Sequence, residues 1–289
     1  MRNIQYWLLS TLSPLYDRTQ ESALRILAYH TVPDREAYER QLRYLHQHYH
    51  VISLEELQRA VAQGEQPPPR SVLITFDDGD RSVYENGLPL HRKYELPAVL
   101  FVITDLIDSQ EPFWWKKVEQ HYAAIGQPHA EARRQVSYLK QVPDDERRAY
   151  LDSLGDDYRQ AQLTTEELRE LGDAGFALAN HTLTHPLVDR CTDERISREV
   201  GGAADYLAKL PDTYPKVFAY PNGNVNERTE QVLRQEGIFL AFLFDHRLSR
   251  QPYHPLRMSR LRVNTYDPLP EFSSKVSGLH SLVYHRSLH

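Results

Sequence analysis

Cysteine is almost absent from this chain of 289 residues, which contains Cys191 and no other. One thiol cannot form an internal disulfide or a thiolate metal centre, so a metal site would have to use histidine and carboxylate side chains. A surplus of positive charge is also missing, because the formal net charge is -6. With no local basic patch in the sequence, we expect no nucleic-acid partner.

The sequence also lacks a hydrophobic run long enough to cross a bilayer. The apolar stretch from Met1 to Leu12 is too short for a transmembrane helix and too interrupted for the core of a signal peptide. We therefore expect a cytoplasmic protein, while attachment to the membrane surface and export stay open. We expect the stretch to be a helix packed on the domain; exposure of Tyr6, Trp7 and Leu8 would instead favour a membrane-surface or partner-binding helix.

The composition that is present is that of an ordinary globular protein, with 40% hydrophobic and 26% charged residues and no repeats. Short β-like runs alternate with helical segments, which predicts an α/β fold with a parallel sheet, and seven or so βα units indicate an incomplete barrel. We expect an N-terminal segment 1–24 and one domain over 25–289, with a helical insertion at about 113–162. The predicted strands are Ile26–Tyr29, Val51–Ile52, Ser71–Phe76, Ala98–Ile103, Phe176–Ala179, Val217–Tyr220, Ile238–Phe244 and Leu261–Val263.

Three acidic residues follow one predicted strand directly. Ser71–Phe76 leads into Asp77, Asp78, Gly79 and Asp80. A turn after the strand can bring Asp77 and Asp78 towards one pocket, where a divalent cation would offset their repulsion. The alternative is an Asx-turn leading to a helix, with Gly79 at a positive φ. We expect Asp80 only to start or cap that helix.

Two histidines, His181 and His185, follow another predicted strand and are four residues apart, a spacing that can place both on one metal ion. The same interval occurs by chance elsewhere in a chain with 14 histidines, but only this pair leaves the carboxyl end of a strand, where α/β folds place their sites. Asp78, His181 and His185 would form a catalytic type of zinc site, with Asp77 taking a proton from water. This set predicts hydrolysis of an amide or ester.

The motifs, in this order, resemble those of the NodB-type polysaccharide deacetylases, carbohydrate esterase family four. The resemblance implies a distorted (β/α)7 barrel and the removal of acetyl groups from N-acetylated, sometimes O-acetylated, sugars. By motif position, Asp77 resembles the catalytic base, and Asp78, His181 and His185 resemble the metal ligands. The segments that carry the resemblance are Leu27-Ala28-Tyr29-His30, Thr75-Phe76-Asp77-Asp78-Gly79, His181-Thr182-Leu183-Thr184-His185-Pro186, Phe218-Ala219-Tyr220-Pro221-Asn222-Gly223 and Leu256-Arg257-Met258-Ser259-Arg260-Leu261.

The third motif departs from the pattern Arg-x-Pro-Tyr of many family members. Ala219 stands where the arginine would steady the base, and Asn222 stands where the tyrosine would be. By position, Tyr220, Pro221 and Asn222 would contact the substrate or hold the oxyanion through a backbone N–H. Because the base then needs another partner, we select Arg260 to pair with it; the alternative is an arginine on an exposed strand edge.

The late Leu-x-His motif that supplies the general acid in the family has no convincing counterpart, and Val283-Tyr284-His285 resembles it only loosely. His30 leaves the first predicted strand at the same barrel mouth, so we expect it to protonate the leaving amine or to hold the substrate. The alternative is a histidine hydrogen-bonded in the first loop. Trp114 and Trp115 would anchor the insertion or stack on a sugar ring. Few basic residues lie near the motifs, so nothing in the sequence suggests recognition of a highly anionic polymer.

Together these features predict a metal-dependent hydrolase that removes acetyl groups from N-acetylated sugars of a polysaccharide or glycan precursor. Zn²⁺ is the expected cofactor because His and Asp ligands suit it. One alternative is an O-deacetylase or another C–N hydrolase on the same barrel. The other is a catalytically inactive glycan-binding protein, because the third-motif arginine is missing and the general acid has no convincing counterpart. The sequence does not specify the glycan, its linkage or its carrier. It does not specify the oligomeric state either.

Overall fold

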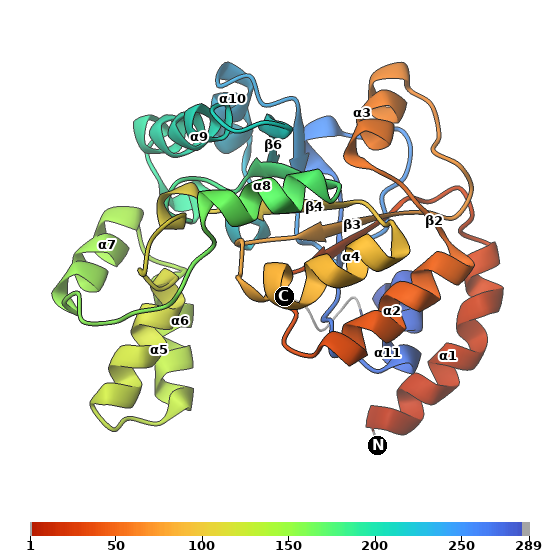
Figure 1. The fold of residues 1–289 in the computed structure, drawn as a ribbon, viewed down its shortest axis with the longest axis horizontal. Coiled ribbons are helices and arrows are strands. Elements are labelled where there is room, and N and C mark those ends of the chain that lie inside the picture. Colours follow the sequence, from red (N-terminus) through yellow and green to blue (C-terminus); the bar gives the residue numbers. More distant parts are fainter. Residues whose placement is uncertain (1, 285–289) are drawn as a thin grey trace.

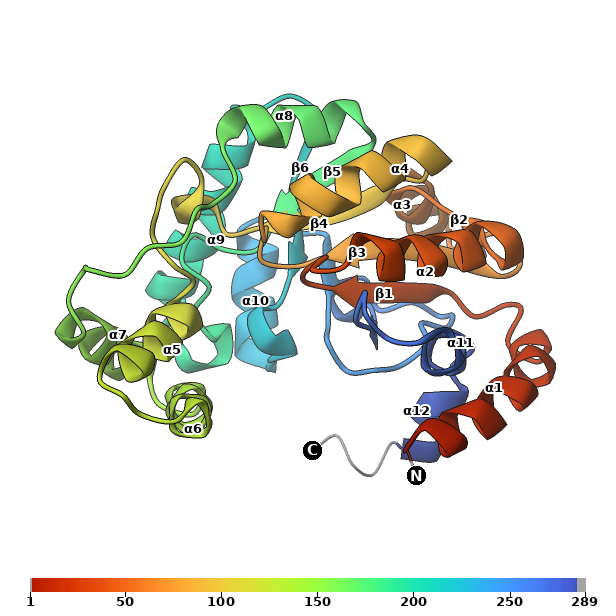
Figure 2. The same ribbon diagram turned by 60° about the horizontal axis from the view of Figure 1, so that its bottom comes forward.

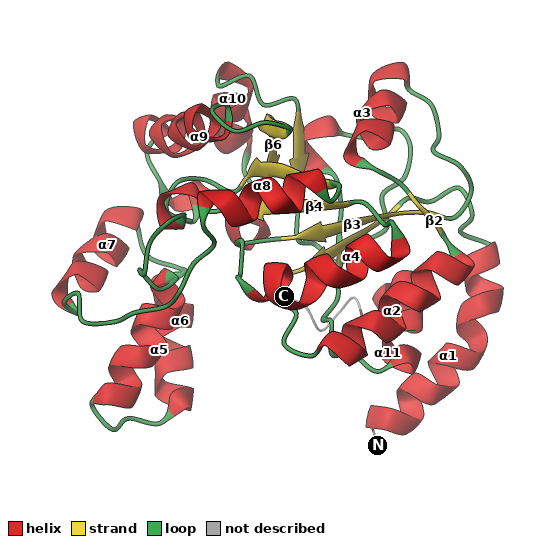
Figure 3. Cartoon of the chain, in the orientation of Figure 1, coloured by secondary structure: helices red, strands yellow, loops and turns green. Residues whose placement is uncertain are grey.

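The structure, a computed structural model, describes residues 2–284 and has a curled sheet of parallel strands at its centre (Figure 1). Helices lie around this sheet, and loops connect the helices to the strands (Figure 3). The strands are β1 (Arg25–Tyr29), β2 (His50–Val51), β3 (Ser71–Phe76), β4 (Ala98–Val102), β5 (Phe176–Asn180), β6 (Thr213–Ala219), β7 (Leu240–Phe242) and β8 (Leu261–Arg262). Each predicted strand is therefore present, although β6 begins earlier than predicted and β7 is shorter.

The order of the strands shows how the sheet curls. Seven strands follow one another as β7-β6-β5-β4-β3-β1-β8, and the short β2 pairs with β3 beside this path. The chain before β8 then reaches the opposite end of the sheet, because Met258 forms a parallel bridge with Phe242 of β7 while Leu261 pairs with Leu27 of β1. The predicted distorted (β/α)7 barrel is confirmed.

The helices begin and end close to where the local sequence signals place them. Ser53 with Glu56 and Thr164 with Glu167 form reciprocal capping boxes at the starts of α3 and α8. The helix expected after the turn at residues 77–79 starts as a π-helical turn, Val83–Gly87, and continues as α4. The α-helices are α1 (Arg2–Arg18), α2 (Arg35–His48), α3 (Leu54–Gln63), α4 (Leu88–Tyr94), α5 (Trp114–Ala124), α6 (His129–Leu139), α7 (Asp144–Ser153), α8 (Thr165–Asp173), α9 (Asp193–Leu207), α10 (Glu227–Gln235), α11 (Leu269–Val276) and α12 (Leu279–Tyr284).

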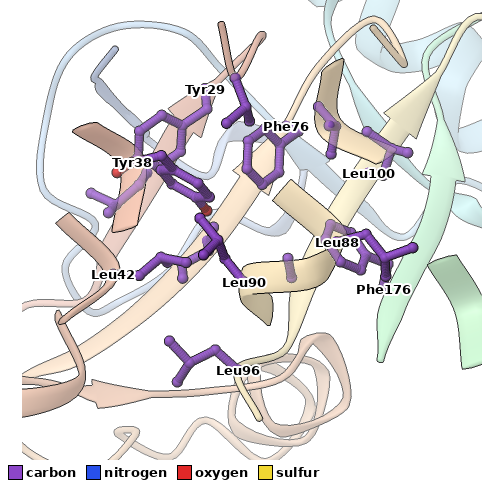
Figure 4. Close-up of a cluster of buried hydrophobic side chains, with 14 of the residues drawn as sticks. Tyr29, Tyr38, Leu42, Phe76, Leu88, Leu90, Leu96, Leu100 and Phe176 are labelled. Carbon is purple, nitrogen blue, oxygen red and sulfur yellow. The ribbon is translucent and has the colours of Figure 1, made fainter. Parts of the chain in front are cut away.

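Strand residues alternate between two apolar clusters because successive side chains on a strand face opposite ways. On β3, Leu73 belongs to the cluster on one face, with Phe101 of β4. Ile74 and Phe76 belong to the cluster on the other face, where Phe76 stacks against Tyr29 at 5.4 Å between ring centroids (Figure 4). Burial on both faces explains why β3 reads as a continuous apolar run.

Two groups of helices lie on opposite sides of the carboxyl ends of the strands (Figure 2). The insertion forms α5, α6 and α7, which share an apolar cluster that includes Trp114 and Leu139. On the other side, α1 packs against α11 and α12, and the Tyr6 hydroxyl lies 3.1 Å from His280 Nε2. The side chains of Trp7 and Leu8 lie outside the described part of the structure.

Within residues 2–284, no helix combines the length and the apolar character that a membrane crossing needs. The exposed fraction of the Leu12 side chain is 56% and that of Leu15 is 68%, so one side of α1 faces solvent. His285, which loosely resembled the late family motif, lies outside the described residues.

Candidate active site

The end of β3 brings two neighbouring carboxylates to one pocket. Thr75 and Asp77 follow Leu73 on the same face of the strand, as the alternation requires. Asp78 would point to the other side, but its backbone adopts a left-handed conformation with φ 72°. Gly79 continues the turn at φ 79°, a positive value as the alternative of an Asx-turn had it. A left-handed aspartate therefore explains how adjacent acids line the same cleft.

Asp78, His181 and His185 meet in space across 107 residues of sequence. The Asp78 Oδ1 atom lies 3.3 Å from His181 Nε2 and 3.4 Å from His185 Nε2. All three side chains are buried, and among residues 2–284 no other set of His, Cys or acidic side chains has this arrangement for a metal ion. The structure thus brings together the predicted ligand set.

Neighbouring groups fix the state of both imidazoles. The carbonyl oxygen of Ala219 lies 2.9 Å from His181 Nδ1, so this nitrogen donates its proton there and Nε2 keeps a free lone pair. Burial lowers the pKa of His185 to about 3, which keeps this imidazole neutral at ordinary pH. For Asp78, burial alone would raise the pKa, but the adjacent His181 imidazole and the nearby His30 hold it well below its usual value.

Arg260 pairs with Asp77, as predicted. Its Nη1 and Nη2 atoms each lie 2.7 Å from one carboxylate oxygen of Asp77, and Nη1 also donates to the hydroxyl of Thr75. The Arg260 side chain is fully buried, so the alternative of an exposed edge arginine is wrong. Burial would raise the pKa of Asp77, but the guanidinium lowers it below the usual value and keeps the carboxylate ionised.

His30 lies at the same mouth, where β1 ends. Its ring packs edge-on against Phe244 at 5.2 Å, and its charge when protonated lowers the pKa of both Asp77 and Asp78. Its ring forms no hydrogen bond to another residue of the described chain, unlike the alternative of a histidine held in the first loop. The ring is half-buried and lines the cleft, where a substrate can reach it.

The third-motif residues do not all reach the cleft. Tyr220 is completely buried in a cluster with Phe218, its hydroxyl donates to the Leu256 carbonyl at 3.0 Å, and its amide donates to the Phe242 carbonyl. The structure therefore gives Tyr220 no place to contact a substrate, contrary to the expectation.

The rest of that motif forms the turn beside the cleft. Pro221 is buried and supports the turn without lining the cleft, whereas Asn222 lines it in a left-handed conformation with φ 59°. Gly223 has a φ of 77°, and a Cβ atom there would lie 2.6 Å from the Cβ of Phe244. Of the three predicted contact residues, only Asn222 presents its side chain to a ligand.

The two tryptophans of the insertion have different surroundings. Trp114 is buried against the Arg147 guanidinium, and its Nε1 atom lies 3.4 Å from His185 Nδ1. Trp115 lines the cleft, stacked parallel to Phe113 and edge-on against His185 at 4.9 Å. Trp114 is therefore an anchor of the insertion, and Trp115 presents an aromatic surface beside the predicted ligand set.

The cleft that His30, Asp77, Asp78, His181 and His185 line has a volume of about 740 Å³. Residues that sequence reasoning missed also line it, among them Lys140 from the end of α6 and Arg262 of β8. Arg262 could have been found, because it is two residues from Arg260 along an extended segment. Lys140 carries no local signal, since it arrives through the packing of the insertion.

Comparison with known proteins identifies the family. The family model described as polysaccharide deacetylase matches residues 64–240, which is more than half of the chain. The chain belongs to the polysaccharide deacetylase family. This confirms the resemblance and the predicted enzyme class, a deacetylase hydrolase.

A poly-beta-1,6-N-acetyl-D-glucosamine N-deacetylase of Staphylococcus aureus is 40% identical over 190 residues, which are 62% of this chain and 50% of that protein. The chain thus spans about half the length of these curated relatives. Among solved structures, the Streptococcus pyogenes deacetylase PplD in complex with acetate aligns over 88% of this chain and 98% of its own, with TM-score 0.64 and 20% identity. IcaB from Ammonifex degensii aligns over 89% and 97%, with TM-score 0.64 and 19% identity. These structures share the fold.

Proposed function

We propose that this chain removes the acetyl group from N-acetylated sugars, assisted by a divalent metal held by Asp78, His181 and His185. The observation that carries the proposal is the meeting of these three ligands beside Asp77, a carboxylate held ionised by Arg260. Family membership supports the reaction, and the ligand set supports the metal.

The donor atoms fit zinc in number, type and spacing. Ligand atoms bound at about 2.0–2.1 Å to one tetrahedral ion are roughly 3.3–3.4 Å apart. The two distances from Asp78 Oδ1 to the imidazole Nε2 atoms, 3.3 and 3.4 Å, agree with this value. Three protein ligands leave a coordination position for water or substrate, as catalytic zinc sites do. The proton on His181 Nδ1 is already placed for binding through Nε2.

Asp77 is the proposed general base. A bound divalent ion would supply Lewis acidity that polarises the acetyl carbonyl and makes water easier to deprotonate. A carboxylate offers about four lone-pair sites, and the two bonds from Arg260 use two of them. Asp77 can therefore accept the proton of the attacking water while Arg260 holds its orientation.

His30 is the proposed general acid. Hydrolysis adds the water oxygen to the acetyl carbon and breaks the bond from that carbon to the sugar nitrogen, which must gain a proton to leave as an amine. His30 lies close to both carboxylates and has no hydrogen bond to another described residue. Its ring is therefore available to give that proton, and acetate and a free amino sugar are the products.

The substrate class follows from two observations. The Staphylococcus aureus relatives are named for a polymer of N-acetylglucosamine, which supports an N-acetylated hexosamine for this chain. Trp115 presents its ring beside His185, where it can stack against the apolar face of a sugar. We propose that the sugar lies on Trp115 with its acetamido group directed at Asp77 and Asp78.

Acetate release from N-acetylhexosamine oligomers by zinc-loaded protein tests this function. N-deacetylation predicts one free amine for each acetate, whereas an O-deacetylase would release acetate alone. An inactive glycan-binding protein would bind the oligomers and release no acetate, with binding unchanged in Asp77→Asn. His46→Ala is a suitable control, because His46 is an exposed histidine of α2 away from the cleft.

A further inference from the structure

Five basic side chains line the cleft, more than the sequence near the motifs suggested. They are Lys116, Arg133, Lys140, Arg262 and Lys275. Three of them have acidic partners: Lys275 lies 2.6 Å from Asp267, and Lys116 and Arg133 both pair with Glu119. Lys140 and Arg262 form no ion pair with a carboxylate of the described residues, so their charges are available to a ligand.

Lys140 extends from the end of the insertion to the third-motif turn. Its Nζ atom donates a 2.8 Å hydrogen bond to the side-chain oxygen of Asn222, a neutral partner. Burial lowers the pKa of Lys140; Asp78 opposes this effect, and the charges of Arg133 and Arg262 lower it further. The structure therefore gathers three cations close enough to repel one another beside the proposed metal site.

Arg262 reaches the same part of the cleft from β8. Its guanidinium lies 4.5 Å from the centre of the Phe244 ring, a cation–π contact that fixes its position without neutralising its charge. The planar head can therefore offer paired N–H donors to an anion. Arg260, two residues earlier, donates both of its terminal nitrogens to Asp77 and is therefore not available to bind an anion.

The cleft is lined by as many acidic residues as Lys and Arg residues, yet none of these acids forms an ion pair with Lys140 or Arg262. Asp77 is paired with Arg260, Glu119 with Lys116 and Arg133, and Glu271 with Lys275. Asp80 accepts a hydrogen bond from the Ser82 amide, and Asp78 lies against the two imidazoles. A divalent cation bound at Asp78 would increase the local positive charge rather than offset it. Because Lys140 and Arg262 line one cleft without a carboxylate partner among the described residues, their N–H donors and charges can be satisfied by a ligand, and the arrangement is that of an anion-binding site.

We propose that Lys140 and Arg262 bind an anionic group, a carboxylate or a phosphate, that the N-acetylated glycan carries next to the sugar being deacetylated. This inference rests on the proposed function and specifies its substrate class. A sugar stacked on Trp115 would then be held at three points: its ring, its acetamido group and its charged substituent. Specificity for a charged glycan would come from the insertion and β8, not from the family motifs.

The test compares neutral and charged substrates that are otherwise alike. The substrates are a neutral N-acetylhexosaminide, the same sugar with a phosphate ester, and the same sugar with a carboxylate. With wild-type protein at low salt, we expect kcat/KM for at least one anionic substrate to exceed that of the neutral one by about 10-fold, the size of one charge-assisted contact. The phosphate and carboxylate arms show which anion the site prefers.

Variants of the two cations decide where that preference arises. Lys140→Gln and Arg262→Gln should each lower kcat/KM for the preferred anionic substrate about 10-fold and change that of the neutral substrate less than about 2-fold. Lys209→Gln removes an exposed lysine at the end of α9, outside the cleft, and should change neither. Thermal unfolding of each variant checks that it is folded.

Three results would overturn the inference: no preference in the wild type, a preference that both glutamine variants keep, or equal losses on neutral and charged substrates. Equal losses would assign the two cations to the reacting carbonyl instead of a substituent. Calorimetric titration of the same sugars into Asp77→Asn protein separates failure of the anion-binding inference from failure of the proposed function. Absence of acetate from every substrate would refute the deacetylase, while tighter binding of the anionic sugar that depends on Lys140 would still support the site.

Discussion

Arg260 donates hydrogen bonds of 2.7 Å to both carboxylate oxygens of Asp77, although 183 residues separate the two in the sequence. The third motif has Ala219 in the place of the arginine that would steady the base, and Arg260 takes over that contact from the segment that closes the barrel. Both side chains are buried, so the pair is shielded from water. We infer that the loss of the motif arginine is compensated and does not mark an inactive protein.

The first prediction concerns this pair and the acidic limb of the pH profile. The pKa of Asp77 is lowered in the folded protein, so its carboxylate and the activity that needs it are lost only when the pH falls through that lowered value. In Arg260→Gln, burial raises the pKa of Asp77 and no guanidinium charge opposes it, so the acidic limb of the kcat/KM profile should move to higher pH. The rate at neutral pH should fall by about 10-fold or more. An unchanged limb would contradict the pairing, and Arg92→Gln, an exposed arginine of α4, is the control.

The second prediction concerns the metal. His181→Ala and His185→Ala should each weaken zinc binding by at least about 100-fold, because each removes one of only three protein ligands. Asp77→Asn should retain zinc, because Asp77 is engaged by Arg260. Metal content after dialysis measures both effects. Chelation should abolish acetate release in the wild type, and added zinc should restore it; activity that survives chelation would contradict a metal-dependent mechanism.

The third prediction uses two glycines with almost the same backbone conformation. Gly223 has φ 77° and Gly155 has φ 76°. A Cβ atom at Gly223 would contact Phe244, whereas a Cβ atom at Gly155 would lie in open space. Gly155→Ala should cost about 1–2 kcal/mol of unfolding free energy, the cost of a left-handed alanine. Gly223→Ala should cost about 1–3 kcal/mol more, because the turn must move. Urea denaturation of both variants measures the difference, and equal costs would show that the turn can give way.

The fourth prediction separates the two tryptophans. Trp114 is 7% exposed and anchors the insertion, so Trp114→Ala should lower the unfolding free energy by about 3–5 kcal/mol. Trp115→Ala should cost less stability but weaken saccharide binding by roughly 5- to 100-fold, because the ring lines the cleft. Denaturation and saccharide titration measure the two effects. Unchanged saccharide binding in Trp115→Ala would show that the ring does not contact the substrate.

Much of the site could be predicted because its residues follow strands. The carboxyl ends of β3 and β5 meet at one edge, so Asp78, His181 and His185 could be placed together before the fold was known. Tyr220 was misplaced although a signal existed. It is two residues after Phe218 on an extended segment, and both side chains lie in the same apolar cluster away from the cleft.

The remaining features depend on tertiary packing. Lys140 meets Asn222 across 82 residues only because α6 packs back over the barrel mouth, and no periodic pattern announces such a contact. The left-handed backbone of Asp78 is likewise a product of its surroundings, since the sequence suggested that conformation for Gly79 alone. Where the chain acts, and where its domain boundaries lie, stay predictions.

The most direct test of the central claim is acetate and free-amine release from an N-acetylhexosamine oligomer by zinc-loaded wild-type and Asp77→Asn protein. We predict equal amounts of acetate and amine from the wild type, and a rate at least about 100-fold lower from Asp77→Asn at unchanged zinc content and saccharide binding. Absence of acetate from the zinc-loaded wild type, or undiminished release from Asp77→Asn, would contradict the account.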